Sequence, residues 1–315
     1  KVKSVIGIGK VKILVSSGSE KAAYNIEIES RNPNPKVTNV VEAAIEPGKT
    51  WTGQFSPAGM AGTNKSVLEL SSVPPINLGE RLKYLIEYPH GCIEQTTSGV
   101  FPQLFLSDIT ELSSDKNAAT DRNIKAALDR YRSFQTNSGG FSYWPGGDYL
   151  SEWGTNYAGH FMIEAELKGF YLPAGMLDSW KRYQKQQANA WSADSRNRYY
   201  DEGLDQAYRL YTLALAKAPE LGAMNRLKEY AKLSVASKWR LAAAYVLCGQ
   251  TEVAKAITHN IPATVNPYTE MDYTYGSDTR DRAMILETLA LLGDKAKATP
   301  LAKDLSALLS KNKWL

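Results

Sequence analysis

The pattern of apolar and polar residues changes at about residue 73 of this 315-residue chain. Before that point, four short segments rich in β-branched residues, often alternating with polar ones, predict strands. These segments are Val11–Val15, Ala23–Glu29, Val37–Ile45 and Ser66–Ser71. Clusters of Gly, Pro, Asn and Ser between them predict the turns. We therefore expect residues 1–73 to form a β-rich domain, either a small sandwich or part of one.

After residue 73 the spacing of apolar residues becomes helical. The prolines of Val73–Pro75 cannot continue a strand ladder and mark the expected boundary. A first helix is expected from Leu78 to just before Pro89. Further helices are expected at 92–107, 119–135, 155–168, 174–190, 203–217, 222–234, 237–248, 251–258, 279–292 and 296–311. Several end in an apolar turn followed by glycine, which is typical of helix C-caps. These glycines are Gly169, Gly249 and Gly293. We therefore expect residues 74–315 to form an α/α toroid or superhelix, which makes the fold mainly α.

Composition narrows the class of protein. The net charge is +4 from 37 basic and 33 acidic residues, without a run of five like charges, so nucleic-acid binding is not expected. The longest apolar stretches, such as Ala283–Leu292, are too short to cross a membrane. Lys1–Ser17 lacks the apolar core of a signal peptide, so the sequence is expected to begin within a longer protein. Three scattered histidines and two distant cysteines suit neither a disulfide framework nor a metal site, and no cofactor or metal is expected.

The segment Tyr88–Thr97 combines a cysteine and a glutamine at a chemically useful spacing. Pro89 and Gly91 permit a tight turn, after which a new helix is expected, with Cys92 and Gln95 on one face of its first turn. A helix N-terminus stabilises a thiolate, which makes Cys92 nucleophilic. A thiolate held against a glutamine carbonyl can expel ammonia and form a cyclic thioester, which survives where water is excluded. Once exposed, this stored acyl group would acylate an amine or hydroxyl and free the thiol.

Other interpretations of the chain stay open at this point. A Cys-x-x-Gln pair arises by chance, and a cysteine in a helix is commonly a small core residue. Carbohydrate-active enzymes also use α/α toroids, with paired carboxylates in a cleft. Four acidic residues near tyrosines supply such groups, namely Asp201, Glu202, Asp272 and Asp278. A passive helical-repeat scaffold, with an unreactive Cys92, is the third interpretation.

Three motifs resemble the alpha-2-macroglobulin family, which includes complement proteins. Tyr88–Ser98 resembles the family's thioester signature in its bacterial Cys-x-Glu-Gln-Thr form. Gly139–Gly147 resembles the loop that follows the next helix, and Tyr275–Ala283 resembles bacterial members near the end of the thioester domain. The resemblance extends over nearly the whole chain. The early strands resemble the first part of the CUB-type domain that surrounds the thioester domain in this family.

The resemblance implies roles for particular residues. Cys92 and Gln95 would be the thioester partners, and Gly91 and Glu94 would be motif residues that shape the turn. The protein would be a single-use covalent trap for proteases and not an enzyme, activated by cleavage of a bait region outside this sequence. Its other partners would be the remaining domains of a larger parent protein, located in the periplasm and possibly lipid-anchored. Some complement relatives have a histidine roughly a hundred residues beyond the thioester that directs it toward hydroxyls. The matching stretch, Asn189–Asn197, has none, which favours reaction with amines.

The remaining candidates have structural alternatives. His160 is expected to be a hydrogen-bonded structural histidine and not a group that reaches the thioester. His90 suits either tuning of Cys92 or an exposed turn. His259 is expected at a helix C-terminus, and Cys248 is expected to pack in the core. The aromatic cluster after the second motif is expected to pack between helices, with a water-excluding cover over the thioester as the alternative. It consists of Tyr143, Trp144, Tyr149 and Trp153.

Overall fold

The computed structural model describes residues 7–30, 37–41, 43, 45, 48–59, 62–68, 70, 78–192, 203–271 and 273–311. The chain divides into two compact units, Lys1–Leu70 and Ser71–Leu315. The boundary expected at Val73–Pro75 lies outside the described residues. The assignment of the first unit to a CUB-type domain remains a prediction.

The first unit contains one antiparallel hairpin. Strand β1 (Gly7–Ser17) pairs with β2 (Glu20–Ser30), in a register that runs from Gly7 opposite Ser30 to Ser17 opposite Glu20. The two-residue connection begins with Gly18 at φ +58°, which suits the first position of a hairpin turn, where a side chain would be strained. Nearly every side chain of both strands is exposed, including apolar ones. The predicted alternation is therefore present, but in the described residues no second layer covers it.

The prediction of strands at Val37–Ile45 and Ser66–Ser71 was wrong for the residues that the structure describes. Their described residues form no strand, and the sheet of the described part of this unit contains β1 and β2 alone. Strand preference depends on packing against cross-strand neighbours more than on the backbone itself. A β-branched segment without a described sheet edge beside it therefore lacks the partner that its pattern requires.

The second unit is helical and follows the predicted order closely. Its helices are α1 (Leu78–Leu85), α2 (Ile93–Val100), α3 (Leu106–Ile109), α4 (Ser114–Arg130), α5 (Glu152–Leu167), α6 (Met176–Ala190), α7 (Leu204–Leu215), α8 (Leu221–Lys228), α9 (Val235–Leu247), α10 (Thr251–Thr258), α11 (Asp278–Leu292) and α12 (Lys295–Lys311). Short 3₁₀ turns, η1 (Pro102–Phe105) and η2 (Tyr131–Ser133), complete it. The helix expected at 92–107 is thus divided into α2, η1 and α3, because Pro102 cannot donate the hydrogen bond that would continue an α-helix. Within the described residues, no helix is both long and apolar enough to span a bilayer.

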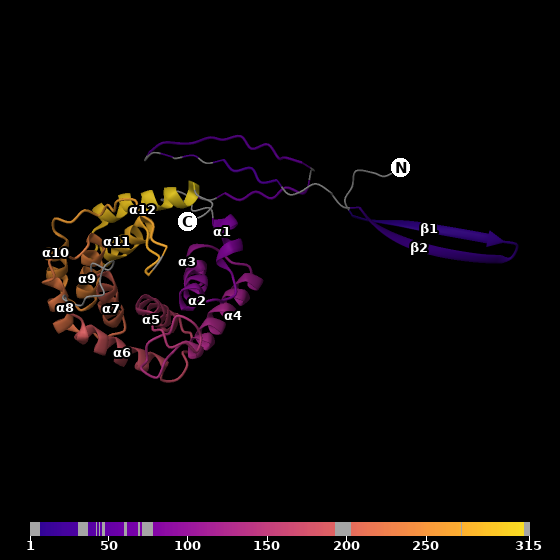
Figure 1. The fold of residues 1–315 in the computed structure, drawn as a ribbon. Coiled ribbons are helices and arrows are strands. Elements are labelled where there is room, and N and C mark those ends of the chain that lie inside the picture. The colour runs from indigo at the N-terminus through magenta and orange to yellow at the C-terminus, as the bar shows by residue number, and fades with distance from the viewer. Residues whose placement is uncertain are drawn as a thin grey trace. The chain divides into compact units, whose positions relative to one another are not determined.

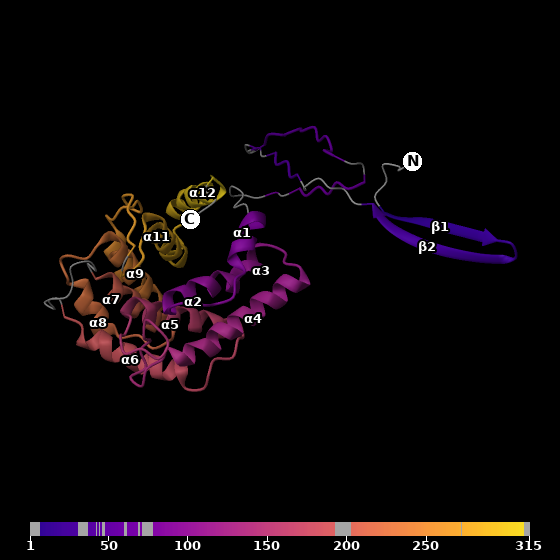
Figure 2. The ribbon, with the colours of Figure 1, turned by 45° about the vertical axis from the view of Figure 1, so that its right-hand side comes forward.

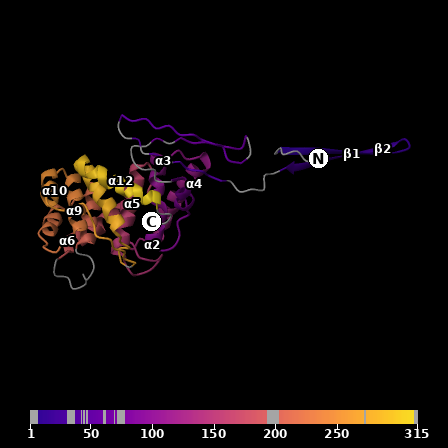
Figure 3. The ribbon, with the colours of Figure 1, turned by 90° about the horizontal axis from the view of Figure 1, so that it is seen from above.

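These helices form a ring of two layers, the α/α toroid that the sequence predicts. The inner layer contains α2, α5, α7, α9 and α11, each packed against the next, and outer helices such as α4, α6, α8 and α10 lie against it (Figure 1). Figure 2 shows α2 between α4 and α5, and Figure 3 shows α9 and α10 far from α3 and α4 within this unit. Burial follows the layers. Residues Leu204–Ala214 of α7 are all buried, whereas the outer α4 buries only one face.

The glycine C-caps are confirmed. Gly169, Gly249 and Gly293 have φ values of +87°, +75° and +70°. In each case the next residue donates its N–H to the carbonyl five residues earlier, at 2.9 to 3.0 Å, as in Gln250 to Tyr245. This is the Schellman pattern, which satisfies carbonyls at a helix end and turns the chain back. The sequence therefore specifies where several of these helices stop.

Candidate functional site

Cys92 occupies the N-cap of α2, the position directly before the first helical residue. Its backbone is extended (φ −71°, ψ 176°) and the residue is only 2% exposed. Gln95 folds back over it in a reciprocal capping arrangement. The Cys92 N–H donates to Gln95 Oε1 at 3.2 Å, and the Gln95 N–H donates to Cys92 Sγ at 3.5 Å. The buried sulfur and the exposed glutamine therefore lie side by side at a helix N-terminus.

Gly91 makes this arrangement possible. It has a φ of +82°, and a Cβ added there would lie 2.1 Å from Gln95 Oε1. The space that a side chain would fill at residue 91 is thus taken by the Gln95 carboxamide. The turn is fastened from outside the motif, because Arg130 Nη2 of α4 donates to the Gly91 carbonyl at 2.8 Å. Sequence reasoning missed Arg130, since an arginine at the end of an amphipathic helix ordinarily signals only solvent exposure.

The other two motifs converge on Cys92. The Ile93 N–H donates to the carbonyl of Tyr143 at 3.1 Å, which attaches the second motif to the first residue of α2. The Tyr143 side chain interacts with that of Cys92, which helps to raise the Tyr143 pKa, and its hydroxyl makes a hydrogen bond of 2.7 Å with the hydroxyl of Tyr275. Tyr275 has a φ of +49°, which is uncommon for a residue with a side chain. Three segments that are far apart in the sequence are therefore linked beside Cys92, the third of them through the Tyr143 hydroxyl.

The electrostatics of Tyr143 favour its protonated form. Hydrogen bonds to Tyr275 and Cys92, with burial as a smaller cause, raise the pKa of the Tyr143 phenol well above its usual value. Tyr143 is therefore a neutral hydrogen-bond donor at any physiological pH.

Glu94 lies on the interior side of α2. The Trp153 indole N–H donates to its carboxyl, yet Oε2 is buried without a hydrogen-bond partner among the described groups. Burial raises the pKa of Glu94 to about 7, against the opposing effects of the Trp153 hydrogen bond and the Arg280 charge. Arg280 stacks over the Trp153 ring, 4.8 Å from its centre, and pairs with Asp281 at 2.9 Å. The motif glutamate is therefore a buried and partly neutral acid beside the cysteine.

The aromatic cluster after the second motif divides between the core and the surface, and its role as a cover over the thioester stays a prediction. Trp153 is 5% exposed and packs against Tyr208, so it belongs to the core. Tyr143 instead reaches Cys92. Trp144 and Tyr149 are exposed.

The histidines occupy the structural positions that their local sequence suggests. His160 Nδ1 lies 2.9 Å from the Tyr208 hydroxyl, and its ring packs edge-on against Phe101. His90 is exposed and its carbonyl accepts from Thr96 Oγ1 at 3.2 Å, as a turn residue would. His259 is the C-cap of α10.

Cys248, expected in the core, lies at a helix end. It is the C-cap of α9, half-buried against the main core, and burial raises the pKa of its thiol.

The carboxylates of the enzyme interpretation do not form a described site. Asp201, Glu202 and Asp272 lie outside the described residues. Asp278 accepts from Arg282 at 2.7 Å, an i to i+4 ion pair in the first turn of α11. The part of the chain that the structure describes also contains no cluster of ligands suited to a metal ion.

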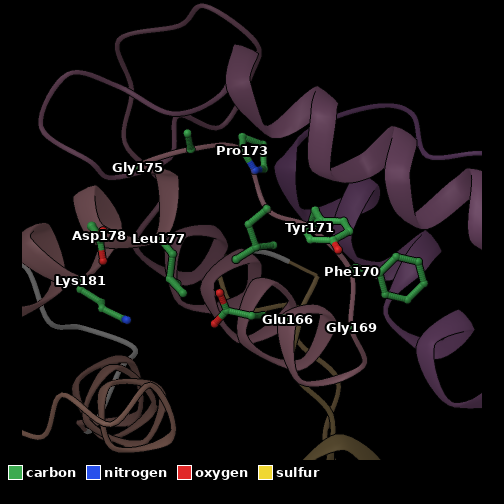
Figure 4. Close-up of a pocket in the computed structure, with 11 residues that line it drawn as sticks. Glu166, Gly169, Phe170, Tyr171, Pro173, Gly175, Leu177, Asp178 and Lys181 are labelled. Atoms are coloured by element: carbon green, nitrogen blue, oxygen red, sulfur yellow. The ribbon is translucent and has the colours of Figure 1, made fainter.

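A cavity of about 580 Å³ lies at the other end of α5 (Figure 4). It is lined by the loop between α5 and α6, together with residues of those helices such as Glu166 and Lys181. Trp153, beside Glu94, is at the first turn of α5, so the cavity is about 20 Å away along the helix. None of the candidate site residues, such as Cys92, Gln95 or His160, lines it.

Known proteins match this chain in sequence and in structure. A family model described as the A-macroglobulin TED domain matches residues 66–209. The alpha-2-macroglobulin of Escherichia coli K12 is 27% identical over 266 residues, which cover 78% of this chain and 16% of that protein. The chain therefore spans about a sixth of the length of this relative.

Solved structures agree with the sequence matches. A crystal structure of Salmonella alpha-2-macroglobulin reacted with methylamine superimposes with a TM-score of 0.61 at 28% identity, covering 77% of this chain and 16% of that one. A structure of the Escherichia coli protein activated by porcine elastase gives 0.61 at 26% identity, covering 78% and 23%. The toroid, the three converging motifs and these similarities lead to one conclusion. Residues 66–209 match the A-macroglobulin TED domain, and the chain is similar to bacterial alpha-2-macroglobulins in sequence and in fold.

Proposed function

We propose that Cys92 and Gln95 form an internal thioester that covalently traps an attacking protein. The thiolate attacks the side-chain carbonyl carbon of Gln95, the C–N bond breaks, and the amide nitrogen takes up the proton that the thiol lost to solvent and leaves as ammonia. An amine that later attacks the same carbon forms an amide, and the C–S bond breaks to free the Cys92 thiol. Each molecule reacts once, so the protein is a trap and not a turnover catalyst. Gly91 and Glu94 support the turn without joining the bond.

The arrangement of Gln95 over Cys92 carries this proposal. The carboxamide is held by the backbone of the residue whose sulfur would attack it, and Gly91 leaves the space that it needs. Holding two reacting groups in contact can supply several kcal/mol of a reaction barrier. An unreactive core cysteine would need neither the folded-back glutamine nor the glycine.

Proteases are the proposed partners of the trap. The Escherichia coli relative was studied after activation by elastase, and the Salmonella relative after reaction with methylamine. By analogy, cleavage in another part of a larger parent protein would expose the thioester to lysine amines of the protease. The other domains of the parent are further partners, because the chain spans only part of its relatives.

Intact mass and peptide mapping test the thioester. We expect a mass lower by one ammonia, methylamine added at Gln95, and alkylation of Cys92 only after that addition. Deamidation confined to Gln95 beside a free Cys92 would indicate a thioester that had formed and hydrolysed. An unmodified Gln95 beside a free Cys92 would contradict the proposed mechanism.

The two cysteines provide matched variants. Cys92→Ser is expected to abolish methylamine uptake while α2 stays folded, because serine is a preferred N-cap residue. Cys248→Ser is expected to keep full uptake. Equal uptake by both variants would show that methylamine reacts elsewhere.

We also propose a periplasmic location for the parent protein, with a possible lipid anchor and a role in bacterial defence. Fractionation of cells that express the parent protein tests this location, and recovery in the cytosol would contradict it.

A further inference from the structure

The proposed reaction needs a group that stabilises the departing sulfur. When an amine attacks Gln95, the electron pair of the C–S bond moves to Cys92 Sγ. Cys92 is only 2% exposed, so few water molecules can solvate its sulfur. Its backbone donor, the Gln95 N–H, is long at 3.5 Å. A thiolate in such a place gains substantially from a further hydrogen bond, because hydrogen bonds to charged groups are the strong ones.

The Tyr143 hydroxyl is placed to be that donor. Its side chain interacts with that of Cys92, and backbone hydrogen bonds hold its segment beside the start of α2. The Tyr143 carbonyl accepts from Ile93, the residue after Cys92, and the Tyr143 N–H donates to Tyr149 at 2.8 Å. The ring packs edge-on against Trp144. The hydroxyl and the sulfur therefore belong to segments that are joined by a direct backbone hydrogen bond.

Tyr275 completes a chain of hydroxyls. Its oxygen lies 2.7 Å from that of Tyr143, and the residue is 41% exposed. A partner of this kind can orient the Tyr143 O–H toward sulfur and polarise it further. Tyr275 is placed there by an uncommon backbone conformation, with a φ of +49°. Such conformations persist where the surrounding structure requires them, and they are frequent at functional sites.

We propose that Tyr143 stabilises the Cys92 thiolate as it leaves the thioester, and that Tyr275 positions the Tyr143 hydroxyl for this task. The inference rests on the proposed thioester. In the step itself, the N–C bond forms at Gln95, the C–S bond breaks, and the sulfur accepts the hydrogen bond from Tyr143. The proton lost by the amine passes to solvent, and Tyr143 keeps its own.

A passive cover is the competing role. The Tyr143 ring could merely keep water from the sulfur, and in that case the hydroxyl would not matter. Tyr143→Phe separates the two roles, because phenylalanine keeps the ring and removes the hydrogen bond. A lost cover would speed aminolysis and hydrolysis, whereas a lost donor would slow both.

The first measurement is the rate of thiol release by methylamine, in the full chain with Cys248→Ser so that Cys92 is the remaining cysteine. Tyr143→Phe is expected to slow release about tenfold, the effect of one hydrogen bond to a charged group. Tyr275→Phe is expected to slow it less, by about threefold, since it acts through Tyr143. Tyr149→Phe is the matched control, because Tyr149 lies on the same loop with its side chain 73% exposed. It is expected to change nothing.

The second measurement is the pH dependence of Cys92 alkylation by iodoacetamide after methylamine treatment. Cys92 is free in this sample whether or not a thioester existed before. Tyr143→Phe is expected to move the midpoint of alkylation to higher pH, since the thiolate loses a donor. His90, Glu94 and Arg130, the other ionisable groups beside this turn, are the same in all variants.

The two measurements separate the possible failures. If the unsubstituted chain shows no mass deficit of one ammonia and takes up no methylamine, the proposed function fails. The alkylation midpoint still tests the interaction between Tyr143 and Cys92. An unchanged midpoint would overturn the inference. The inference would also be overturned, in favour of a passive cover, if Tyr143→Phe released its thiol as fast as the unsubstituted chain or faster.

Discussion

The two cysteines of this chain occupy opposite ends of helices, and their surroundings differ accordingly. Cys92 is the N-cap of α2, where N–H groups and the positive end of the helix dipole favour a thiolate. Cys248 is the C-cap of α9, where its own N–H is used to bond carbonyls of the last turn. Burial raises the pKa of the Cys248 thiol, and Lys217 opposes this only in part. The same side chain therefore lies at a helix N-terminus in one place, and at a helix C-terminus where burial raises its pKa in the other.

The comparison shows that the N-terminus of α2 carries local conflicts that the C-terminus of α9 lacks. Around Cys92 lie a buried carboxyl at Glu94 and a turn that excludes any side chain at Gly91. After Cys248 comes a regular Schellman cap, in which Gly249 has open space around it. Proteins tolerate such conflicts mainly at functional sites. Replacing Glu94 and Gly91 one at a time should therefore show how much each conflict contributes to the difference between the α2 and α9 ends.

Glu94→Gln is expected to have the largest effect on stability. The folded-state pKa of Glu94 is raised from 4.5 to about 7, so the unfolded chain ionises first. The contribution of the neutral carboxyl is fully present below pH 4.5 and is lost as the pH rises through about 7. This corresponds to about 3 kcal/mol at most. Glutamine imitates the neutral form, so the variant should be more stable than the parent chain at pH 8 and similar to it at pH 4.5.

Urea unfolding at several pH values measures this difference. Glu252→Gln is the control near the other cysteine, because Glu252 lies in α10 with its side chain 86% exposed. Its effect should stay within about 0.5 kcal/mol at every pH. A difference between Glu94→Gln and the parent chain that does not vary with pH would show that burial of the carboxyl is not the cause.

Gly91→Ala and Gly249→Ala form a second pair, with smaller effects on stability. Both glycines have a positive φ, of +82° and +75°, so each alanine should cost about 1 to 2 kcal/mol. Only at residue 91 does the new Cβ meet another group, the Gln95 side chain. We expect Gly91→Ala to lose methylamine uptake and Gly249→Ala to keep it. Uptake by folded Gly91→Ala would contradict the role given to the glycine.

The helical part of the fold could be predicted from the sequence because its signals are local. Apolar spacing located the helices, and glycines such as Gly169 and Gly293 marked where they end, which the structure confirms. The β-rich part could not be predicted equally well. Alternation in Val37–Ile45 indicates a strand, but no local signal says which strand pairs with it, and its described residues form none.

The candidate site shows the same limit. The spacing of Cys92 and Gln95 placed them on one helical turn, and the structure adds their reciprocal hydrogen bonds. Resemblance singled out the segments that contain Tyr143 and Tyr275, yet nothing in the sequence paired two hydroxyls that are 132 residues apart. Arg130 was missed for the same reason, because its target is a backbone carbonyl 39 residues away. Contacts across the ring depend on how the helices close, which local patterns do not encode.

The smallest expected effect concerns Cys248. Because burial raises the pKa of its thiol, alkylation by iodoacetamide should be slow at pH 8 and should increase at higher pH than for a free cysteine. Lys217 acts in the opposite direction, so Lys217→Gln should slow the reaction further. Lys217 is exposed, and added salt should therefore reduce the difference between the variant and the parent chain. Mass spectrometry of the Cys248 peptide across this pH range measures the effect. Rapid alkylation at pH 7 would mean that the α9 end is open, and that helix position alone does not account for the difference between the two cysteines.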